Sequence, residues 1–256
     1  MKIAVLVKQV PGPESVLPIN DLGSWIDEEP VTFVMNSPDN FALEEALLIK
    51  ENKGDGEVVV LSMGPDRVQK VIREGLAKGA DRGIHIEEVG HIEKDPLIIA
   101  KRFTAVLKDE KFDLVLTGLQ SDDTGMGQTG VLIGEMLGIP TATLAVETDI
   151  KDNRIRLKRE LESGWFQWVE FPLPASISIQ SGLNTPRYPS LKGIMGAKKK
   201  EIKTVTSSEI DNSSNSQSVD KIFVPQTSKQ TEVIDGEADA AVERIVEILR
   251  SEIKVI

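Results

Sequence analysis

Short apolar runs alternate with amphipathic segments over the first 146 residues of the chain. The runs at residues 3–7 and 58–62 are continuously apolar, which is typical of strands buried on both faces of a parallel sheet. Shorter runs at residues 83–86, 114–117 and 141–146 follow the same pattern. Between them, apolar residues recur at helical spacing, most clearly from Val68 to Leu76, and this helix is expected to stop at Gly79. The alternation predicts an α/β fold with a doubly wound, mostly parallel sheet.

Three of the predicted helices carry recognisable start signals. Ser37-Pro38-Asp39 places proline in a first turn, where it is tolerated, and an acid where the helix dipole favours it, so a helix is expected to about residue 52. Asp95-Pro96 predicts another helix, to about residue 109. The third is expected to begin at Gln128 and to end before Gly138.

The pattern changes after residue 147. Residues 150–160, with a turn at Asp152-Asn153, and residues 165–171 indicate an added antiparallel hairpin, and residues 175–180 alternate as one more strand. Residues 204–220 are rich in serine and poor in large apolar residues, which favours a flexible linker. A short strand at 222–225 and a helix at about 237–253 form an extended C-terminal arm. The expected organisation is an α/β domain at 1–203, a linker at 204–220 and an arm at 221–256.

Composition excludes several classes of function. The net charge of −11 argues against binding to nucleic acid, which needs a basic surface. Without cysteine, and with only two histidines, His85 and His91, the chain offers neither a thiolate nor a His-rich metal site. No stretch approaches the ~20 apolar residues of a membrane span, so direct membrane insertion is not expected. The N-terminus enters a strand directly, without a signal peptide, which favours a cytoplasmic location.

The segment 184–200 has a layout that core packing does not explain. Pro186 and Pro189 stiffen a loop that presents a single large apolar residue, Leu191, and a stiff apolar tip loses little entropy when it docks on a partner. The alternative is a surface turn whose leucine packs onto its own domain. The lysines at 198–200 are either a solvated face or a means of steering an acidic partner.

A second polar segment, residues 120–130, follows the fourth predicted strand. Ligands of doubly wound sheets bind at the carboxyl ends of the strands, where the strand order reverses. The glycines of this segment allow close backbone approach, and Gln128-Thr129-Gly130 opens a helix whose free N–H groups suit a phosphate. It is neither a G-x-G-x-x-G nor a Walker loop, so an ordinary glycine-rich loop is the alternative.

Catalytic residues are not indicated. The charged run 158–164 could be interpreted as general acid–base machinery, but alternating charges on a solvent-facing strand explain it more simply. The sequence offers no Ser-His-Asp set or metal cluster, so any chemistry is expected to come from a cofactor.

Several short motifs, in order, resemble the β subunit of electron transfer flavoproteins over residues 1 to about 203. They are Val7-Lys8-Gln9, Leu43-Glu44-Glu45-Ala46, Gly64-Pro65, Lys78-Gly79-Ala80-Asp81-Arg82-Gly83, Gln128-Thr129-Gly130, Lys158-Arg159-Glu160-Leu161-Glu162-Ser163-Gly164, and Asn184-Thr185-Pro186-Arg187-Tyr188 with Leu191, Ile194-Met195 and Ala197-Lys198-Lys199-Lys200. The resemblance implies a Rossmann-like fold of the adenine-nucleotide alpha-hydrolase type.

The resemblance also implies an adenine-nucleotide pocket. Its residues would be Leu6, Asn36, Ser37, Pro38, Asp39, Met63, Ser121, Asp122, Asp123, Thr124, Gly125, Met126, Gly127, Gln128, Thr129, Gly130, Val131 and Leu132. Most members of the family hold AMP there, whereas electron-bifurcating members hold a second FAD. Thr129-Gly130-Val131 resembles the AMP branch, and Asp39 is reminiscent of the bifurcating one.

By the same resemblance, the chain is an electron carrier subunit that pairs with an α subunit in a heterodimer. The redox FAD lies mainly in the α subunit, and the aromatic residue that often contacts it from the β side is replaced here by Pro13. The implied partners are acyl-CoA or other flavin dehydrogenases as donors and a membrane quinone oxidoreductase as acceptor. The residues expected to dock these partners are Pro186, Arg187, Tyr188, Leu191, Ile194 and Met195.

Three other functions remain open at this point. One is a bifurcating subunit with a second FAD, and another is an ATP-dependent adenylating enzyme of the same fold, with Asp122-Asp123 as its candidate metal ligands. The third is a structural nucleotide-sensing subunit. The final helix has two possible destinations, its own domain or, as the resemblance implies, the α subunit.

Overall fold

The computed structural model describes residues 1–88, 95–210, 215, 217–225 and 231–256. The chain forms two compact units, Met1–Lys221 and Ile222–Ile256, which are described separately. His91 and linker positions 211–214 and 216 lie outside the described residues.

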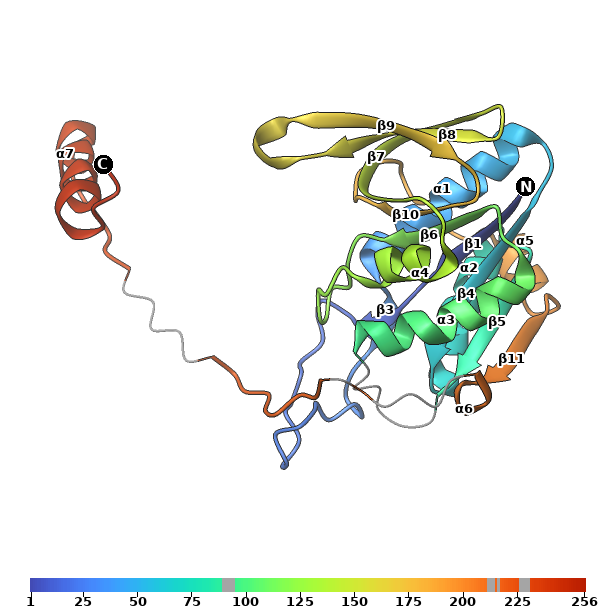
Figure 1. Cartoon of the computed structure of the whole chain (residues 1–256). Helices are drawn as coiled ribbons and strands as arrows, with labels where there is room; N and C mark the ends of the chain where they lie inside the picture. The colour runs from blue at the N-terminus through green and yellow to red at the C-terminus, as the bar shows by residue number, and fades with distance from the viewer. Residues whose placement is uncertain (89–94, 211–214, 216, 226–230) are drawn as a thin grey trace. The chain divides into compact units, whose positions relative to one another are not determined.

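The first unit is built on a nine-stranded sheet (Figure 1). The pairs from β11 to β7 are parallel, and β7, β8 and β9 pair antiparallel. This architecture confirms the expected fold class. In spatial order the strands are β11 (Ile202–Thr206), β5 (Arg82–Glu87), β4 (Glu57–Gly64), β1 (Lys2–Leu6), β6 (Leu114–Gly118), β10 (Ala175–Ile179), β7 (Thr141–Lys151), β8 (Arg154–Glu160) and β9 (Phe166–Pro172).

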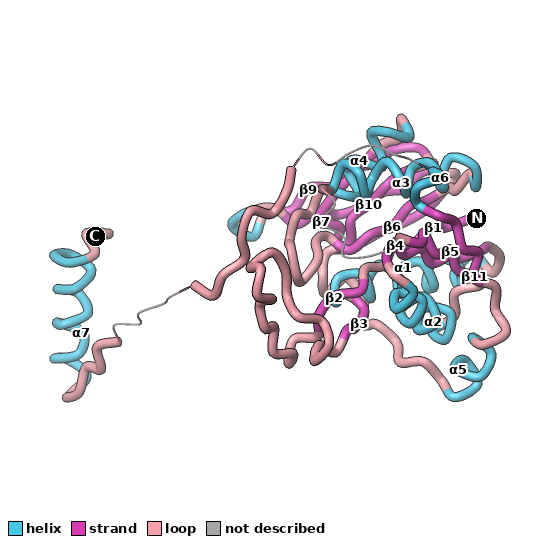
Figure 2. Tube along the Cα trace, turned by 90° about the horizontal axis from the view of Figure 1, so that it is seen from below, coloured by secondary structure: helices cyan, strands magenta, loops and turns pink. Residues whose placement is uncertain are grey.

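Helices cover both faces of the sheet, as Figures 1 and 2 show. On one face lie α1 (Ser37–Lys53), α2 (Gln69–Lys78) and α5 (Leu191–Ala197), and on the other lie α3 (Pro96–Glu110), α4 (Thr129–Leu137) and α6 (Ser207–Ile210). Two apolar cores fill the layers between helices and sheet. The central strands contribute to both cores, which is why their sequences are continuously apolar.

A small antiparallel pair lies beside the main sheet. It consists of β2 (Gln9–Pro11), directly after β1, and β3 (Phe33–Met35), directly before α1. The sequence analysis did not predict these strands, because each is only three residues long and lies near prolines. The pair closes the loop of residues 12–32 at its base.

The structure confirms a strand at residues 175–180 and corrects two other expectations. This strand, β10, is not part of the antiparallel hairpin: it is parallel, lies between β6 and β7, and each of its residues is buried. The linker does not begin at residue 204, because Thr204–Thr206 belong to β11, which pairs with β5 and leads into α6. Residues 222–225 are not a strand, and Phe223 and Val224 are exposed there without a pairing strand in the described part of the chain.

The second unit contains α7 (Ala238–Glu247) and a wider helical turn, Ile248–Glu252. These elements confirm the expected C-terminal helix, and its apolar residues, among them Val242 and Ile245, are exposed. Across the described ranges, no helix has both the length and the apolar content needed to cross a membrane.

The strand order reverses at β1. From β1 the chain moves outward to β4 and β5, and then returns to place β6 on the other side of β1. In an open α/β sheet such a reversal leaves a crevice at the carboxyl ends of the two diverging strands. Here those ends are the residues after Leu6 and Gly118.

Candidate functional site

A cavity of about 360 Å³ lies at this reversal point. Leu6 and Gly118 line it from the ends of β1 and β6, and the loop from Leu119 to Gly127 lines one side. The expected nucleotide residues that line it are Leu6, Asn36, Asp39, Met63, Ser121, Asp123, Thr124, Met126, Gly127, Gln128, Thr129 and Gly130. The remaining ones, Ser37, Pro38, Asp122, Gly125, Val131 and Leu132, are not part of its lining.

Asp39 joins the first turn of α1 to both diverging strands. Its Oδ2 accepts a hydrogen bond from the backbone N–H of Lys8 at 2.7 Å, and its Oδ1 accepts one from Gly118 at 3.0 Å. Glycine is required at position 118 because a Cβ there would lie 2.7 Å from the carbonyl carbon of Pro38. Both oxygens of the Asp39 carboxyl group are therefore used to connect α1 with the ends of β1 and β6.

Burial raises the pKa of Asp39 to about 7, against the opposing effect of the hydrogen bonds from Lys8, Asn36 and Gly118. A carboxyl group whose pKa is higher in the folded state binds more protons there than in the unfolded chain. Its contribution to stability is therefore present at low pH and is lost as the pH rises from about 4 through 7.

We expect this effect in urea unfolding of wild type and Asp39→Asn between pH 4 and 8. The asparagine variant cannot titrate at this position, so the wild-type free energy of unfolding, taken relative to the variant, should decrease up to about pH 7 and then level off. A difference that stays constant or increases with pH would contradict the assignment.

The loop that follows β6 is fixed to the start of α1 by three hydrogen bonds. The Asn36 amide donates to the carbonyl of Gln120 at 3.0 Å and accepts from the N–H of Asp122 at 2.9 Å. The Asp122 carboxylate in turn accepts from the N–H of Ser37 at 3.1 Å. Ser37 and Asp122 thus shape the loop from outside the cavity lining.

Lys8 brings a positive charge to this loop. Its Nζ lies 2.6 Å from Asp123 Oδ1, and it donates to the hydroxyls of Ser121 at 3.3 Å and Thr124 at 3.4 Å. Burial alone would raise the pKa of Asp123, but the charge and hydrogen bond of Lys8 outweigh it and hold that pKa below its ordinary value. A phosphate entering the cavity would meet this ammonium group and the two hydroxyls, together with the Asp123 carboxylate that pairs with Lys8.

Helix α4 points its N-terminus at the same cavity. Gln128, Thr129 and Gly130 line it, and the first N–H groups of a helix have no intrahelical acceptor. The Gln128 side chain does not cap them. Glycine at position 130 lets the helix pack close to the sheet, because a Cβ there would lie 2.7 Å from Thr117 Oγ1. The free N–H groups at the start of α4 and the helix dipole suit an anion.

On the opposite helix layer, the loop before α5 is anchored to α1 by buried carboxylates. The Nε and Nη2 atoms of Arg187 each donate to the Glu44 carboxylate, with a shortest distance of 2.9 Å in both cases. The backbone N–H of Arg187 donates to the same carboxylate at 3.0 Å. It also binds Glu51. Asn184 donates to the Phe41 carbonyl at 3.0 Å and to Glu45 at 3.1 Å.

Helix α5 is capped at its start and held on α2 at its end. The Ser190 hydroxyl caps its start by accepting from the N–H of Gly193 at 3.0 Å. At its end, Arg73 of α2 donates to the carbonyls of Ala197 at 2.6 Å and Lys200 at 2.7 Å. Lys200 Nζ donates back to the carbonyl of Leu76 at 3.0 Å.

This anchored segment presents apolar side chains to solvent. The exposed fractions are 94% for Tyr188, 83% for Leu191 and 73% for Met195, with Ile194 at 44%. The alternative in which Leu191 packs onto its own domain is therefore wrong. We refer to Tyr188, Leu191, Ile194 and Met195 as the docking platform.

The comparisons with known proteins identify the family of the chain. The family model described as the electron transfer flavoprotein domain matches residues 24–210. The chain belongs to the electron transfer flavoprotein β-subunit family. It is 37% identical to electron transfer flavoprotein subunit beta of Methylophilus methylotrophus, over 97% of this chain and 98% of the relative. The subunit of the same name from Thermoanaerobacterium thermosaccharolyticum is 34% identical over 98% of each chain, and that from Bacillus subtilis 31% over the full length of both.

Family membership makes this chain an electron-transfer protein. The motif at 158–164 lies outside the cavity lining. Lys158 lies over the Phe166 ring at 4.2 Å, and Arg159 donates to the Thr143 carbonyl at 2.9 Å. No group of three or more potential metal-ligating side chains occurs within residues 1–88 and 95–210 or in the described part of the arm.

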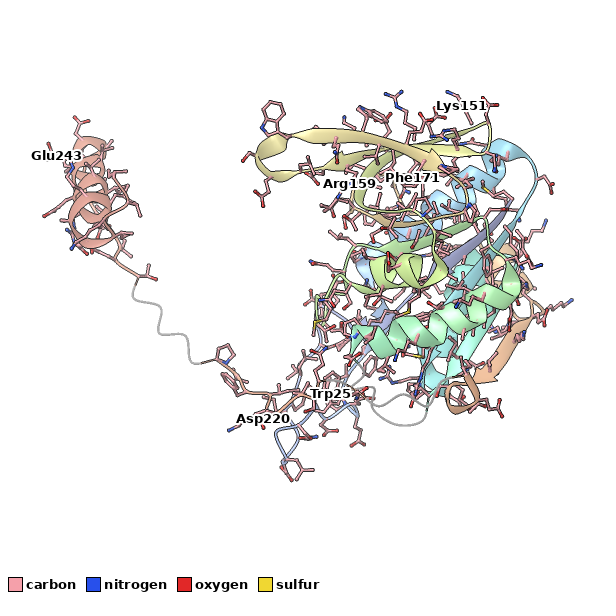
Figure 3. The ribbon with its side chains drawn as sticks, in the orientation of Figure 1. Trp25, Lys151, Arg159, Phe171, Asp220 and Glu243 are labelled. Carbon is pink, nitrogen blue, oxygen red and sulfur yellow. The ribbon has the colours of Figure 1, made fainter. Side chains whose placement is uncertain are left out.

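The sequence analysis did not include three further residues that line the cavity of this electron transfer flavoprotein chain, Gln9, Trp25 and Arg67. Arg67 stands there, 3.8 Å from the Phe33 ring, and donates to Gln9 Oε1 at 2.6 Å. Trp25, labelled in Figure 3, donates to Glu28, which Arg67 also binds. Gln9 and Arg67 follow β1 and β4, so the rule for strand ends could have found them, whereas Trp25 lies in a loop without any periodic pattern.

Proposed function

We propose that this chain is the β subunit of a heterodimeric electron carrier that holds AMP in the cavity at the β1–β6 reversal. Its α subunit would hold most of a shared FAD. The electrons would come from acyl-CoA or other flavin dehydrogenases and pass to a membrane quinone oxidoreductase, and the complex would be cytoplasmic. The observation that carries the proposal is the cavity, which is lined by the N-terminal residues of α4 and by Lys8.

The cavity favours a mononucleotide over a second FAD. Its volume of about 360 Å³ is near the lower end of the ~300–1,000 Å³ range of small-molecule pockets. Asp39, the residue reminiscent of the bifurcating branch, has both carboxylate oxygens bound to backbone N–H groups. Its presence is thus explained by the fold, without a flavin. The Thr129 and Gly130 N–H groups and Lys8 would hold the phosphate of AMP.

The shared FAD would supply the electron-accepting chemistry. What this chain adds is the docking platform, held at a set position on α1 and α2 by Arg187, Asn184 and Lys200. The proposal assigns the capture of the dehydrogenase to Leu191 and its neighbours. The C-terminal unit, with the exposed apolar side chains of α7, is proposed to pack on the α subunit.

Nucleotide content tests this proposal directly. The chain is copurified with its α subunit, the complex is denatured, and the released nucleotides are separated and quantified. We expect one FAD and one AMP per heterodimer. A Leu191→Ala complex, altered outside the cavity, is the matched control and should give the same content.

Other results would select the alternatives. Two FAD and no AMP would contradict the AMP assignment and identify a bifurcating subunit. ATP turnover by the isolated chain would support an adenylating enzyme, with Asp122 and Asp123 as its candidate metal ligands. A complex that contains AMP but no flavin would indicate a nucleotide-sensing subunit.

A further inference from the structure

Aromatic side chains contribute to the lining of the candidate nucleotide cavity, and the described ones are Trp25, Phe33 and Phe103. Only 5% of Phe103 is exposed, and this residue belongs to one of the two apolar cores. One face of the Phe33 ring is covered by Arg67, whose guanidinium carbon lies 3.8 Å from the ring centroid. Trp25, labelled in Figure 3, is half-buried and belongs to a loop rather than to a core. Of these aromatic residues, Trp25 is therefore the one best placed to contact a ligand.

A chain of polar contacts connects Trp25 to the segment that follows β1. The indole Nε1–H donates to Glu28 Oε1 at 3.1 Å. Arg67 Nη2 donates to the same oxygen at 3.1 Å, and Arg67 Nη1 donates to Gln9 Oε1 at 2.6 Å. The Gln9 side chain donates back to the Arg67 carbonyl at 3.0 Å. Since Trp25 and Glu28 belong to the loop of residues 12–32, these contacts attach that loop to residues at the ends of β1 and β4.

Core packing does not account for this arrangement. Trp25, Glu28 and Arg67 are each only partly buried, and none of them belongs to either apolar core. What the contacts do fix is the position of the indole ring in the cavity lining. A ring that is already held in place loses little conformational entropy when a ligand binds to it. The arrangement is therefore typical of a pre-organised binding surface.

A mononucleotide has two parts that need different surroundings. Its phosphate needs donors and positive charge, which the first N–H groups of α4 and Lys8 offer in this cavity. Its base needs a flat apolar partner, because every nucleobase has a π-face that stacks on aromatic side chains. An indole offers a large aromatic surface, and the polar N–H of Trp25 is already bonded to Glu28. The same cavity thus combines a phosphate-binding element with a fixed aromatic ring.

We propose that Trp25 is the base contact of the nucleotide cavity, and that Arg67 is a positioning residue that holds the indole ring in place through Glu28. This inference rests on the proposed AMP site and names the residue that recognises the base. The phosphate is bound by the loop after β6 and the start of α4, whereas the base is bound by the loop of residues 12–32. Arg67 affects the nucleotide only through the position of Trp25.

The test measures the binding of two ligands to the complete heterodimer. Exchange of labelled AMP gives the Kd of AMP, and competition with this label gives the Kd of ribose phosphate, which has the phosphate but no base. Trp25→Ala should raise the Kd of AMP about tenfold, because the loss of one stacked aromatic ring weakens binding by that order. The Kd of ribose phosphate should change by less than about twofold, since the residues proposed to bind the phosphate are unaltered.

Trp165→Ala is the matched control, because Trp165 is 73% exposed and lies outside the cavity lining. This variant should leave both Kd values unchanged. Trp25→Leu is a second variant for the case in which alanine disturbs the loop; it keeps a bulky apolar side chain without the aromatic ring, and it should also weaken AMP selectively. An equal rise of both Kd values in the two Trp25 variants would overturn the inference, because Trp25 would then only support the wall of the cavity.

A double-mutant cycle tests the positioning role of Arg67. Arg67→Ala alone should raise the Kd of AMP about fivefold and leave that of ribose phosphate unchanged. In the Trp25→Ala background it should have no further effect, because the ring through which it acts has been removed. Additive losses would overturn the positioning role. Arg156→Ala, which removes a guanidinium 4.3 Å from the Trp168 ring outside the cavity lining, is the control and should be silent.

The outcomes separate the base contact from the AMP site itself. A wild-type complex that binds neither AMP nor ribose phosphate would contradict the proposed nucleotide site, and this inference with it. If the wild type binds AMP and both Trp25 variants bind it equally well, only the base contact is refuted. A selective loss of AMP in the Trp25 variants, together with a non-additive effect of Arg67→Ala, is the result expected.

Discussion

Replacing Leu191 with alanine should lower kcat/KM for reduction of the heterodimer by its dehydrogenase about 30-fold, without loss of FAD or AMP. The side chain is 83% exposed, so its removal costs the free protein almost nothing. In the docked complex it would be the central apolar anchor, and truncation of such a hot spot costs about 2 kcal/mol or more, which corresponds to about 30-fold. The measurement is the initial rate of FAD reduction at sub-saturating carrier.

Leu22 provides a matched control, because this leucine is 87% exposed and belongs to the loop of residues 12–32. Leu22→Ala should leave the rate within twofold of wild type. An unchanged rate for Leu191→Ala under the same conditions would remove the anchor role from this residue. Equal losses in both variants would indicate a general effect of surface hydrophobicity.

The second large effect is expected for Arg187→Ala, which should lower the free energy of unfolding by about 3 kcal/mol. Only 6% of the Glu44 side chain is exposed, and Arg187 supplies both its guanidinium and its backbone N–H to that carboxylate. Removal of one partner of a buried ion pair leaves the other charge without compensation, which costs ~3–5 kcal/mol. Urea unfolding of the two proteins measures the difference.

An exposed ion pair in the same domain gives the control. Arg154 and Glu170 are 48% and 49% exposed, so Arg154→Ala should cost no more than about 1 kcal/mol. Adding Glu44→Gln to Arg187→Ala should recover part of the loss, because the stranded charge is then gone. Similar losses for Arg187→Ala and Arg154→Ala would show that Glu44 does not need its buried partner.

Local sequence signals predicted the elements but not all of their partners. The continuously apolar strands and the proline-bearing helix starts each carry their signal within a few residues, and the structure confirms them. The placement of β10 between β6 and β7 was missed, because a buried strand looks the same in a hairpin as in a parallel sheet. Strand β11 was missed because Ile202 and Val205 are its only large apolar residues.

Glu44 and Glu45 illustrate the same limit at the level of side chains. In a helix with Leu43, Ala46 and Leu47 on its apolar face, two adjacent acids are typical of a solvent-facing surface. Both are buried, because Arg187 and Asn184 reach them from a segment about 140 residues further along the chain. Periodicity within a helix carries no information about such distant partners.

The lining of the cavity could be predicted from the sequence only in part. The rule that ligands lie at strand ends uses only the order of strands, and it located the loop after β6, whereas Leu6 and Met63 came from the resemblance to the family. It could not give the direction of individual side chains. Asp39 turned out to bind backbone N–H groups, and Trp25 and Arg67 also line the cavity.

In the segment 184–200, the residues that attach it to the fold are different from the residues that it exposes to solvent. Asn184, Arg187 and Lys200 form the attachments to α1 and α2, whereas Tyr188, Leu191 and Met195 protrude into solvent. With the proposed docking role, partner preference can drift, or be redesigned, by exchanging protruding side chains while the scaffold keeps its stability. A carrier of this kind would acquire new electron donors during evolution without first solving a folding problem.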